Sequence, residues 1–419
     1  MQASNSALYV SRVGLMLSRS IASVKSTGSI SSPSVACSNR PVQCQGRKLQ
    51  QLRGISFWGS SRNESNSDKN VQGWKKAVSE AEKIVGYPTS FMSLRCLLSD
   101  ELSNVAIQMR KLVGTGHPLL QIARKFFFDG KHNMQMRGLL VLLVSKAAGP
   151  VEGSTMETRE TMVSGIYPSQ RSVAEITEMI HTAKLIHRGV INLAQLATNG
   201  ESSLQDMVFG NKIAVLSGDF LLANASAALA ALHNTKVVEI MSSAITDLMQ
   251  AEFTRFSDHH NLPPDDATVS EWEEHTFLAS GSLIAKSCKS TMLMAQHSDE
   301  VQQKMFDFGR HVAFARQLYD DLQPFTGPTE APDQLNPFSI PVILASLRQH
   351  SQEPARTALF GTLAEKKELF RRLSDSDVIG EARSLCHEHG VQAIEALSQF
   401  PDSDAKLALA NMTRAMTAV

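Results

Sequence analysis

The sequence predicts an all-α protein, a large bundle of long helices. Prolines are absent from residues 169–262 and again from residues 265–323. Such stretches suit long helices, because proline disrupts a helix interior. Alternating runs of Val, Ile and Thr bounded by turn residues, the pattern of strands, are scarce. A chain of 419 residues, 42% of them hydrophobic, is also long enough to bury a sizeable core.

Apolar periodicity places the helices along the chain after Gly73, with a loop rich in Pro, Gly and Asp at 324–337. We expect a second loop at Phe256–Ala267. Two segments, Leu139–Val144 and Ile213–Leu222, are apolar on more than one face, which predicts central helices. The expected helices span 74–84, 92–112, 117–129, 134–148, 171–195, 206–232, 234–255, 268–296, 298–322, 339–349, 355–372, 377–397 and 402–417.

The first 63 residues differ in composition from the rest. They contain eight basic residues, fifteen serines and no acidic residue. Residues 8–24 alternate apolar side chains with Arg12, Arg19 and serines, which suits an amphipathic import helix. This pattern predicts a disordered mitochondrial transit peptide over residues 1–63, cleaved between Arg40 and Glu64. The alternative is a disordered basic tail without a targeting role.

The rest of the chain is mildly acidic, with 33 basic and 41 acidic residues. It therefore offers no electrostatic argument for binding nucleic acid. No run of 18 or more uncharged apolar residues occurs, so a transmembrane segment is not expected. Beyond the N-terminal segment, Cys96, Cys288 and Cys386 are far apart and odd in number, which fits a reducing compartment.

Four stretches carry family information: Glu178–Asn192, Phe209–Ala225, Leu283–Cys288 and Phe308–Phe325. Their order and spacing resemble the all-trans polyprenyl diphosphate synthases, from about residue 80 to the C-terminus. The block that begins Phe-Gly-Asn-Lys at Phe209 is the most specific of the four. The resemblance implies the isoprenoid (polyprenyl) synthase fold, in which long antiparallel helices surround a central cavity. It also implies a single domain over residues 74–419.

Catalytic members of that family carry two facing Asp-Asp-x-x-Asp motifs. These motifs hold Mg²⁺, and the metal holds the allylic diphosphate. At the acidic positions of the first motif, this chain has Arg188, Gly189 and Asn192. A guanidinium has no lone pair for a metal and would repel one, and glycine weakens the helix there. We therefore assign no catalytic residue.

The second motif is partly retained. Asp320 and Asp321 are present, whereas Pro324 occupies the last acidic position. These two carboxylates are the candidate metal ligands. The alternative is an ordinary acidic helix end before a turn that the proline terminates.

Three residues are candidate remnants of the substrate sites that the resemblance implies. Arg137 remains from the family's Gly-Gly-Lys-x-x-Arg-Pro sequence for isopentenyl diphosphate, but Met134 replaces its lysine. Gln317 matches a substrate-side position, and Lys212 either contacts phosphate or simply begins a helix. A diphosphate is held by cationic side chains, and most of those that the family uses are absent from this chain. We therefore expect most of the binding energy for a diphosphate to be lost.

A chain that keeps the family framework and lacks its chemistry is typical of a partner subunit. The resemblance implies a non-catalytic or regulatory subunit of a heteromeric mitochondrial synthase that makes the ubiquinone side chain. Its partner would be a motif-intact catalytic paralogue, in a heterodimer or heterotetramer, with Mg²⁺ held by that partner. We expect residence in the matrix, with peripheral contact with the inner membrane left open. The alternatives are a weakly active prenyltransferase and a polyprenyl- or lipid-binding module.

Overall fold

A computed structural model describes residues 66–86, 117, 136–151, 161–193, 201–257, 268–326, 336–348 and 362–418. All of them belong to one compact unit, Arg62–Val419. The predicted transit peptide, the predicted helices 92–112 and 117–129, and most of the predicted loop after Phe256 lie outside the described residues.

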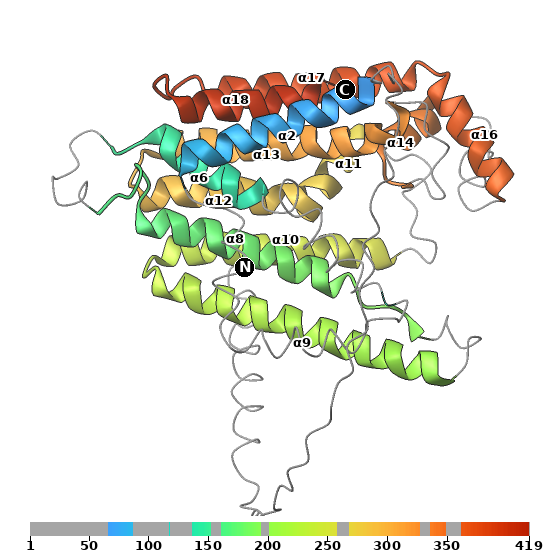
Figure 1. The fold of residues 1–419 in the computed structure, drawn as a ribbon, viewed down its shortest axis with the longest axis horizontal. Helices are drawn as coiled ribbons and strands as arrows, with labels where there is room; N and C mark the ends of the chain where they lie inside the picture. The colour runs from blue at the N-terminus through green and yellow to red at the C-terminus, as the bar shows by residue number, and fades with distance from the viewer. Residues whose placement is uncertain are drawn as a thin grey trace, which may run out of the picture. The chain divides into compact units, whose positions relative to one another are not determined.

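Helices make up nearly all of the described chain, as the sequence predicts (Figure 1). The described residues contain no strand beyond an isolated bridge between Val163 and Ile166. The α-helices are α2 (Asn66–Val85), α6 (Met136–Ala148), α8 (Pro168–His187), α9 (Glu201–Ala231), α10 (Thr235–Ser257), α11 (Val269–Thr276), α12 (Ser282–Met294), α13 (Asp299–Leu322), α14 (Ile340–Arg348), α16 (Leu363–Ser374), α17 (Val378–Ala396) and α18 (Asp404–Thr417).

Local sequence explains where several helices begin. Thr268 caps α11 and Thr362 caps α16, and each threonine exchanges hydrogen bonds with a glutamate three residues later. This capping box satisfies amide donors that the first turn of a helix leaves unpaired. α8 begins with Pro168, whose missing N–H costs nothing at a first helical position.

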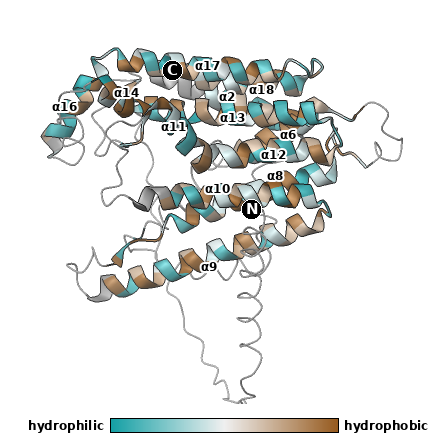
Figure 2. Ribbon diagram, turned by 180° about the vertical axis from the view of Figure 1, so that it is seen from behind, coloured by the Kyte–Doolittle hydropathy of each residue, from teal (hydrophilic) through white to brown (hydrophobic). Residues whose placement is uncertain are grey.

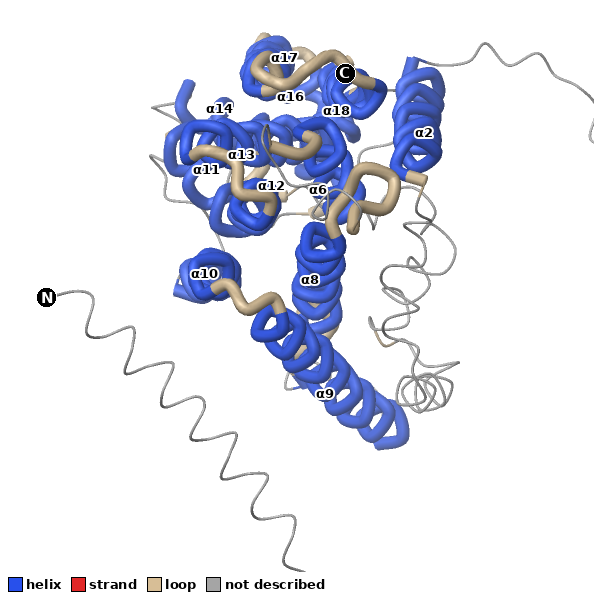
Figure 3. Tube along the Cα trace, turned by 90° about the vertical axis from the view of Figure 1, so that its left-hand side faces the viewer, coloured by secondary structure: helices blue, strands red, loops and turns tan. Residues whose placement is uncertain are grey.

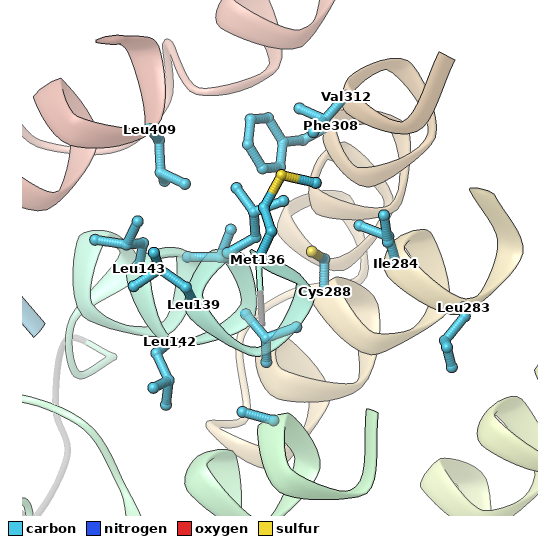
Figure 4. Packing of buried hydrophobic residues seen from close by; sticks show 14 of the residues in the cluster. Met136, Leu139, Leu142, Leu143, Leu283, Ile284, Cys288, Phe308, Val312 and Leu409 are labelled. Carbon is cyan, nitrogen blue, oxygen red and sulfur yellow. The ribbon is translucent and has the colours of Figure 1, made fainter. Parts of the chain in front are cut away.

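The core is centred on α6, which packs against α2, α8, α12 and α18. Residues Leu139–Val144 are all buried, so the prediction of a central helix there is confirmed. Figure 4 shows Met136 of α6 between Leu139 of the same helix and Cys288 of α12, with Phe308 of α13 next to Met136. Apolar side chains of several helices thus form one continuous cluster, and removing them from water stabilises the bundle.

A close crossing joins α12 to α13 at Gly309. A Cβ at this position would lie 2.6 Å from the Cα of Ala285, well inside normal van der Waals contact. Only glycine therefore allows this approach. The crossing matters for the site because α13 carries the second acidic motif.

Three predictions about helices are wrong in detail. The helix expected over 171–195 ends at His187, since the amides of Arg188, Gly189 and Val190 bond back within the last turn. The helix expected over 268–296 is divided by a π-helical turn, Phe277–Gly281. Ile213–Leu222 is not central, because Val215 and Leu216 are exposed on α9.

α9 packs mainly against α8 and has a face that no other described helix covers (Figure 3). Its exposed apolar residues are Leu204, Val208, Val215 and Leu216. Figure 2 shows apolar residues recurring along this helix. By length and composition alone, Leu204–Ala231 could also cross a membrane. One such helix is weak evidence for a membrane span, because core helices of other proteins pass the same test. Four large apolar side chains exposed on one helix are typical of a surface that contacts a partner or a membrane.

Candidate functional site

The first motif positions lie in a turn rather than on a helix. Because α8 ends at His187, Arg188 is the residue that caps it and Gly189 is buried in the turn that follows. Asn192 is exposed two residues beyond Val190. The three positions therefore do not share one helix face, as they would if the predicted helix continued to residue 195.

A carboxylate on α10 holds the end of α8. Oε1 of Glu252 lies 3.6 Å from Nζ of Lys184 and 3.4 Å from Nε of Arg188. Nζ of Lys184 also donates a hydrogen bond to the carbonyl oxygen of Ala279, at 2.5 Å. The place where the family resemblance implies metal-binding carboxylates is thus occupied by two cations and their counter-ion.

Arg137 of α6 contacts the same face of α8. Its Nη1 lies 2.9 Å from Nε2 of His181. Burial and three neighbouring cations, Arg137, Lys184 and Arg188, hold the pKa of His181 well below its usual value. His181 is therefore neutral at physiological pH, and its Nε2 accepts the hydrogen bond from Arg137.

Glu178 lies one turn before His181 and is only 1% exposed. Its Oε1 accepts a hydrogen bond from the backbone N–H of Gly138, at 2.6 Å. Among the described residues, its Oε2 has no hydrogen-bond partner. Burial raises the pKa of Glu178 to about 7, although that hydrogen bond and the charge of Arg137 oppose the shift. This carboxyl is therefore an incomplete counter-ion for Arg137 at neutral pH.

The second acidic motif divides into two different environments. Asp320 forms an ion pair with Arg316 one turn earlier, at 2.9 Å, and attracts Arg137 electrostatically. The guanidinium of Arg316 in turn lies over the rings of Trp74 and Tyr319, 5.2 Å from each centroid. Asp320 is thus already paired with a cation on its own helix.

Asp321 faces away from this group, toward α14. Its Oδ2 accepts a hydrogen bond from the backbone N–H of Ile340, at 3.0 Å, and its Oδ1 accepts one from Nε2 of Gln317, at 2.8 Å. Burial raises the pKa of Asp321 to about 7. Asp321 therefore holds the start of α14, and Gln317 holds Asp321. An ordinary acidic helix end, the alternative given above for this pair, would not make this contact.

These carboxylates do not fit a Mg²⁺ site. Asp320 is paired with Arg316, and Asp321 is bonded to Gln317 and to the backbone of Ile340. Among the described residues, no group of three or more His, Cys, Asp or Glu side chains could hold a metal ion. Mg²⁺ requires several oxygen ligands in near-octahedral geometry, which this arrangement does not supply.

The Phe209-Gly-Asn-Lys block has a structural part to play. Gly210 leaves room for the imidazole of His117, which a Cβ would overlap. The side chain of Asn211 bonds both the N–H and the C=O of Ile191, at 2.9 and 2.8 Å, and so holds the turn after α8. Lys212 is exposed on α9.

The Gly-Asp pair of the same block holds the end of α8. Gly218 gives space to His187, whose Nε2 lies 3.3 Å from Oδ1 of Asp219. The most specific part of the sequence thus joins α9 to α8 and to the turn at Arg188. These contacts position the motif and do not add a reactive group.

The sequence interpretation named Arg137, Arg188 and Asp320, and the structure brings them into one charged group. It missed Lys184, Glu252, Arg316 and the role of Glu178. One signal was available, because His181, Lys184 and Arg188 are spaced at i, i+3 and i+7 and share a helix face. Glu252 lies on α10 and is brought to this face only by tertiary packing.

The all-helical architecture defines the class of protein, an all-α bundle with the isoprenoid synthase fold. The polyprenyl synthase of Caulobacter crescentus, solved with calcium and isoprenyl diphosphate, superposes with a TM-score of 0.56 at 19% identity, covering 85% of this chain and 99% of that one. A medium/long-chain prenyl pyrophosphate synthase of Arabidopsis gives a TM-score of 0.52 at 28% identity, covering 77% and 98%. The predicted fold class is confirmed.

Residues 118–371 match the family model described as polyprenyl synthetase, and the chain belongs to this family. The rat protein named All trans-polyprenyl-diphosphate synthase PDSS2 is 48% identical over 88% of this chain and 92% of its own length. A Neurospora crassa protein named as a probable mitochondrial hexaprenyl pyrophosphate synthase is 31% identical over 98% of both chains. The resemblance seen in the four sequence stretches is therefore confirmed.

Proposed function

We propose that this chain is a non-catalytic, regulatory subunit of a heteromeric mitochondrial all-trans polyprenyl diphosphate synthase, the counterpart of subunit 2 of decaprenyl or solanesyl diphosphate synthase. The assembled enzyme adds isopentenyl diphosphate units to an allylic diphosphate and so makes the side chain of ubiquinone. The names of the rat and Neurospora relatives support a part in polyprenyl diphosphate synthesis, and the Neurospora name supports a mitochondrial location. The basic, acid-free N-terminal segment supports import into the matrix.

One observation carries the non-catalytic assignment. At the first motif, Arg188 is ion-paired with Glu252, so a fixed cation occupies the place of a metal ligand. At the second motif, Asp321 is committed to the backbone of α14. We propose that a paralogue with intact acidic motifs holds Mg²⁺ and performs the chemistry, in a heterodimer or a heterotetramer.

The uncovered face of α9 is the surface we propose for this partner. Its exposed apolar residues form a stripe, interrupted by Lys212, on a helix whose other side is packed on α8. Obligate assemblies bury large, mostly apolar areas, and an isolated chain with such a face is prone to aggregate. The paralogue would cover the stripe and thereby stabilise both chains.

The test is prenyl transfer from radiolabelled isopentenyl diphosphate, with Mg²⁺ and a farnesyl or geranylgeranyl primer. Residues 64–419, the motif-intact paralogue and the two coexpressed are assayed side by side. We expect activity only from the coexpressed pair. Asp320→Ala in this chain should then leave turnover nearly unchanged, whereas the same change in the partner's motif should abolish it.

Other outcomes would select an alternative. Mg²⁺-dependent turnover by this chain alone, lost in Asp320→Ala, would identify a weak prenyltransferase that uses Asp320 and Arg137. Lipid that copurifies with an inactive chain, detected by mass spectrometry, together with no effect on the paralogue, would identify a lipid-binding module.

A further inference from the structure

Two histidines join α13 to α17 through their imidazole rings. Nδ1 of His311 on α13 lies 3.1 Å from Nδ1 of His389 on α17, and the rings stack with centroids 5.4 Å apart. A charged group lies at the other nitrogen of each ring. Nη2 of Arg310 is 3.4 Å from Nε2 of His311, and Oε1 of Glu273 on α11 is 3.6 Å from Nε2 of His389. Side chains of three helices thus form one continuous row.

The partners in this row fix where its protons lie. A guanidinium can only donate, so Nε2 of His311 accepts from Arg310 and the proton of His311 is on Nδ1. That Nδ1–H donates to Nδ1 of His389, whose own proton is then on Nε2, facing Glu273. The opposite direction would set two donors against each other at Arg310 and two acceptors at Glu273. All three contacts therefore select the same arrangement of two neutral rings.

Aromatic side chains shield the histidine pair from water. The side chain of His389 is 8% exposed. Phe314 of α13 presents its ring to both imidazoles, with centroid distances of 5.0 Å to His389 and 6.3 Å to His311. Trp272 of α11 packs against Phe314 in turn, at 6.0 Å. A charge on either ring would therefore be poorly solvated.

The charges around the pair do not offset this burial. Burial lowers the pKa of His311 to about 4 and also lowers the pKa of His389; Arg310 adds to both shifts, and nearby carboxylates oppose them. The charged groups that face the two rings come from the same three helices: Arg310 and Asp307 on α13, Glu388 on α17 and Glu273 on α11.

We propose that the histidine pair is an acid-sensitive latch, which holds α17 against α13 and releases it locally when either ring gains a proton. Each ring has one nitrogen without a proton, and that nitrogen already accepts a hydrogen bond. A proton on His389 would set two Nδ1–H donors face to face. A proton on His311 would place an imidazolium against the guanidinium of Arg310. The latch would thus couple acidity to the helix that carries Asp320, whether or not this chain is catalytic.

The arrangement of protons can be tested on the unaltered full chain. Histidine is labelled at its ring nitrogens, and nitrogen NMR is recorded at about pH 7.5. Spectra of His311→Asn and His389→Gln assign the two rings. We expect His311 protonated on Nδ1 and His389 on Nε2. The same protonated nitrogen in both rings, or a charged ring at this pH, would overturn the proposal.

Local opening can be measured at a buried thiol next to the latch. Cys386 lies one turn before His389, is 1% exposed, and its Sγ is 3.5 Å from the carbonyl oxygen of Ala315 on α13. Cys288 on α12 is fully buried outside the latch and is the internal control. Reaction of each thiol with a dithiodipyridine reagent is followed by peptide mass spectrometry. Each rate is divided by that of free cysteine at the same pH, which removes the titration of the thiol itself.

The expected acid response follows from His311. Opening returns its pKa from about 4 to the ordinary 6.5, so the closed state is favoured above pH 6.5 and loses that advantage as pH falls toward 4. Between about pH 7.5 and about pH 5, labelling of Cys386 should therefore rise by at least roughly 30-fold. Cys288 should change by less than about twofold. An unchanged Cys386, or an equal rise at both thiols, would overturn the proposal.

Substitutions then assign the response to the latch. The double variant His311→Asn and His389→Gln removes both titrating rings, and Cys386 labelling should then vary with pH by less than about twofold. His297→Asn is the matched control, because His297 is also partly buried, with a lowered pKa, but bonds to the carbonyl of Gly149. It should keep the full response. A response that persists in the double variant, or is lost equally in His297→Asn, would contradict the latch. Should the double variant fail to fold by circular dichroism, the NMR and the two thiols of the unaltered chain decide the question.

Discussion

Replacing Leu216 by glutamate should prevent assembly with the catalytic paralogue. Leu216 is 55% exposed and belongs to the apolar stripe at the middle of α9. Leu407 on α18 is 56% exposed and lies outside that stripe, which makes Leu407→Glu a matched control. Both substitutions place a carboxylate on the surface of the isolated chain, so neither should alter its own fold by more than about 0.5 kcal/mol.

The expected magnitude follows from the exposure. Complete burial of a leucine contributes about 1.5–3 kcal/mol, and roughly half of the side chain of Leu216 is left for a partner to cover. Losing that contact costs about 0.8–1.5 kcal/mol. Burying an unpaired carboxylate in the interface adds several kcal/mol. A total of at least ~3 kcal/mol corresponds to a loss of about 100-fold in affinity.

The assay is recovery of this chain on a tagged, motif-intact paralogue after coexpression, followed by sedimentation of the purified complex. Circular dichroism of each variant checks that the helices are intact. We expect Leu216→Glu to be lost from the complex and Leu407→Glu to be retained. Equal recovery of the two variants would refute the assignment of α9 as the interface.

Three further predictions concern stability. Gly309→Ala should destabilise the chain by about 1–3 kcal/mol in urea unfolding, because its Cβ meets Ala285, whereas Gly380→Ala, with nothing within 4 Å, should stabilise it by about 0.5–1 kcal/mol. If both shift the midpoint in the same direction, the crossing is not tight. Burial, with Arg310 and His389, lowers the pKa of His311 from 6.5 to about 4, so its contribution is present above pH 6.5 and is lost as pH falls toward 4. Urea unfolding of His311→Asn and the original chain should therefore differ by an amount that depends on pH in this window, and a constant difference would contradict the inference. Finally, the melting temperature of this chain alone should be the same in Mg²⁺ and EDTA, and a rise with Mg²⁺ would reveal a metal site.

The sequence by itself determined the fold class, because helix formation follows from local periodicity and from the placement of proline. It also determined that the acidic side chains of the first motif are missing, since Arg188 and Gly189 offer Mg²⁺ no side-chain oxygen and Asn192 offers only a neutral amide oxygen. Burial of Leu139–Val144 was predictable for the same local reason, namely an apolar run with no polar face.

Only the tertiary structure decided what replaced that chemistry. Glu252 is 64 residues after Arg188, and no local pattern brings the two together. Likewise, Asp320 and Asp321 are neighbours in sequence but point to Arg316 and to α14, because adjacent helical residues lie about 100° apart. The exposure of Leu216 also depends on which neighbours pack on α9. Charge pairing and burial are relations between distant segments, so packing sets them and composition does not.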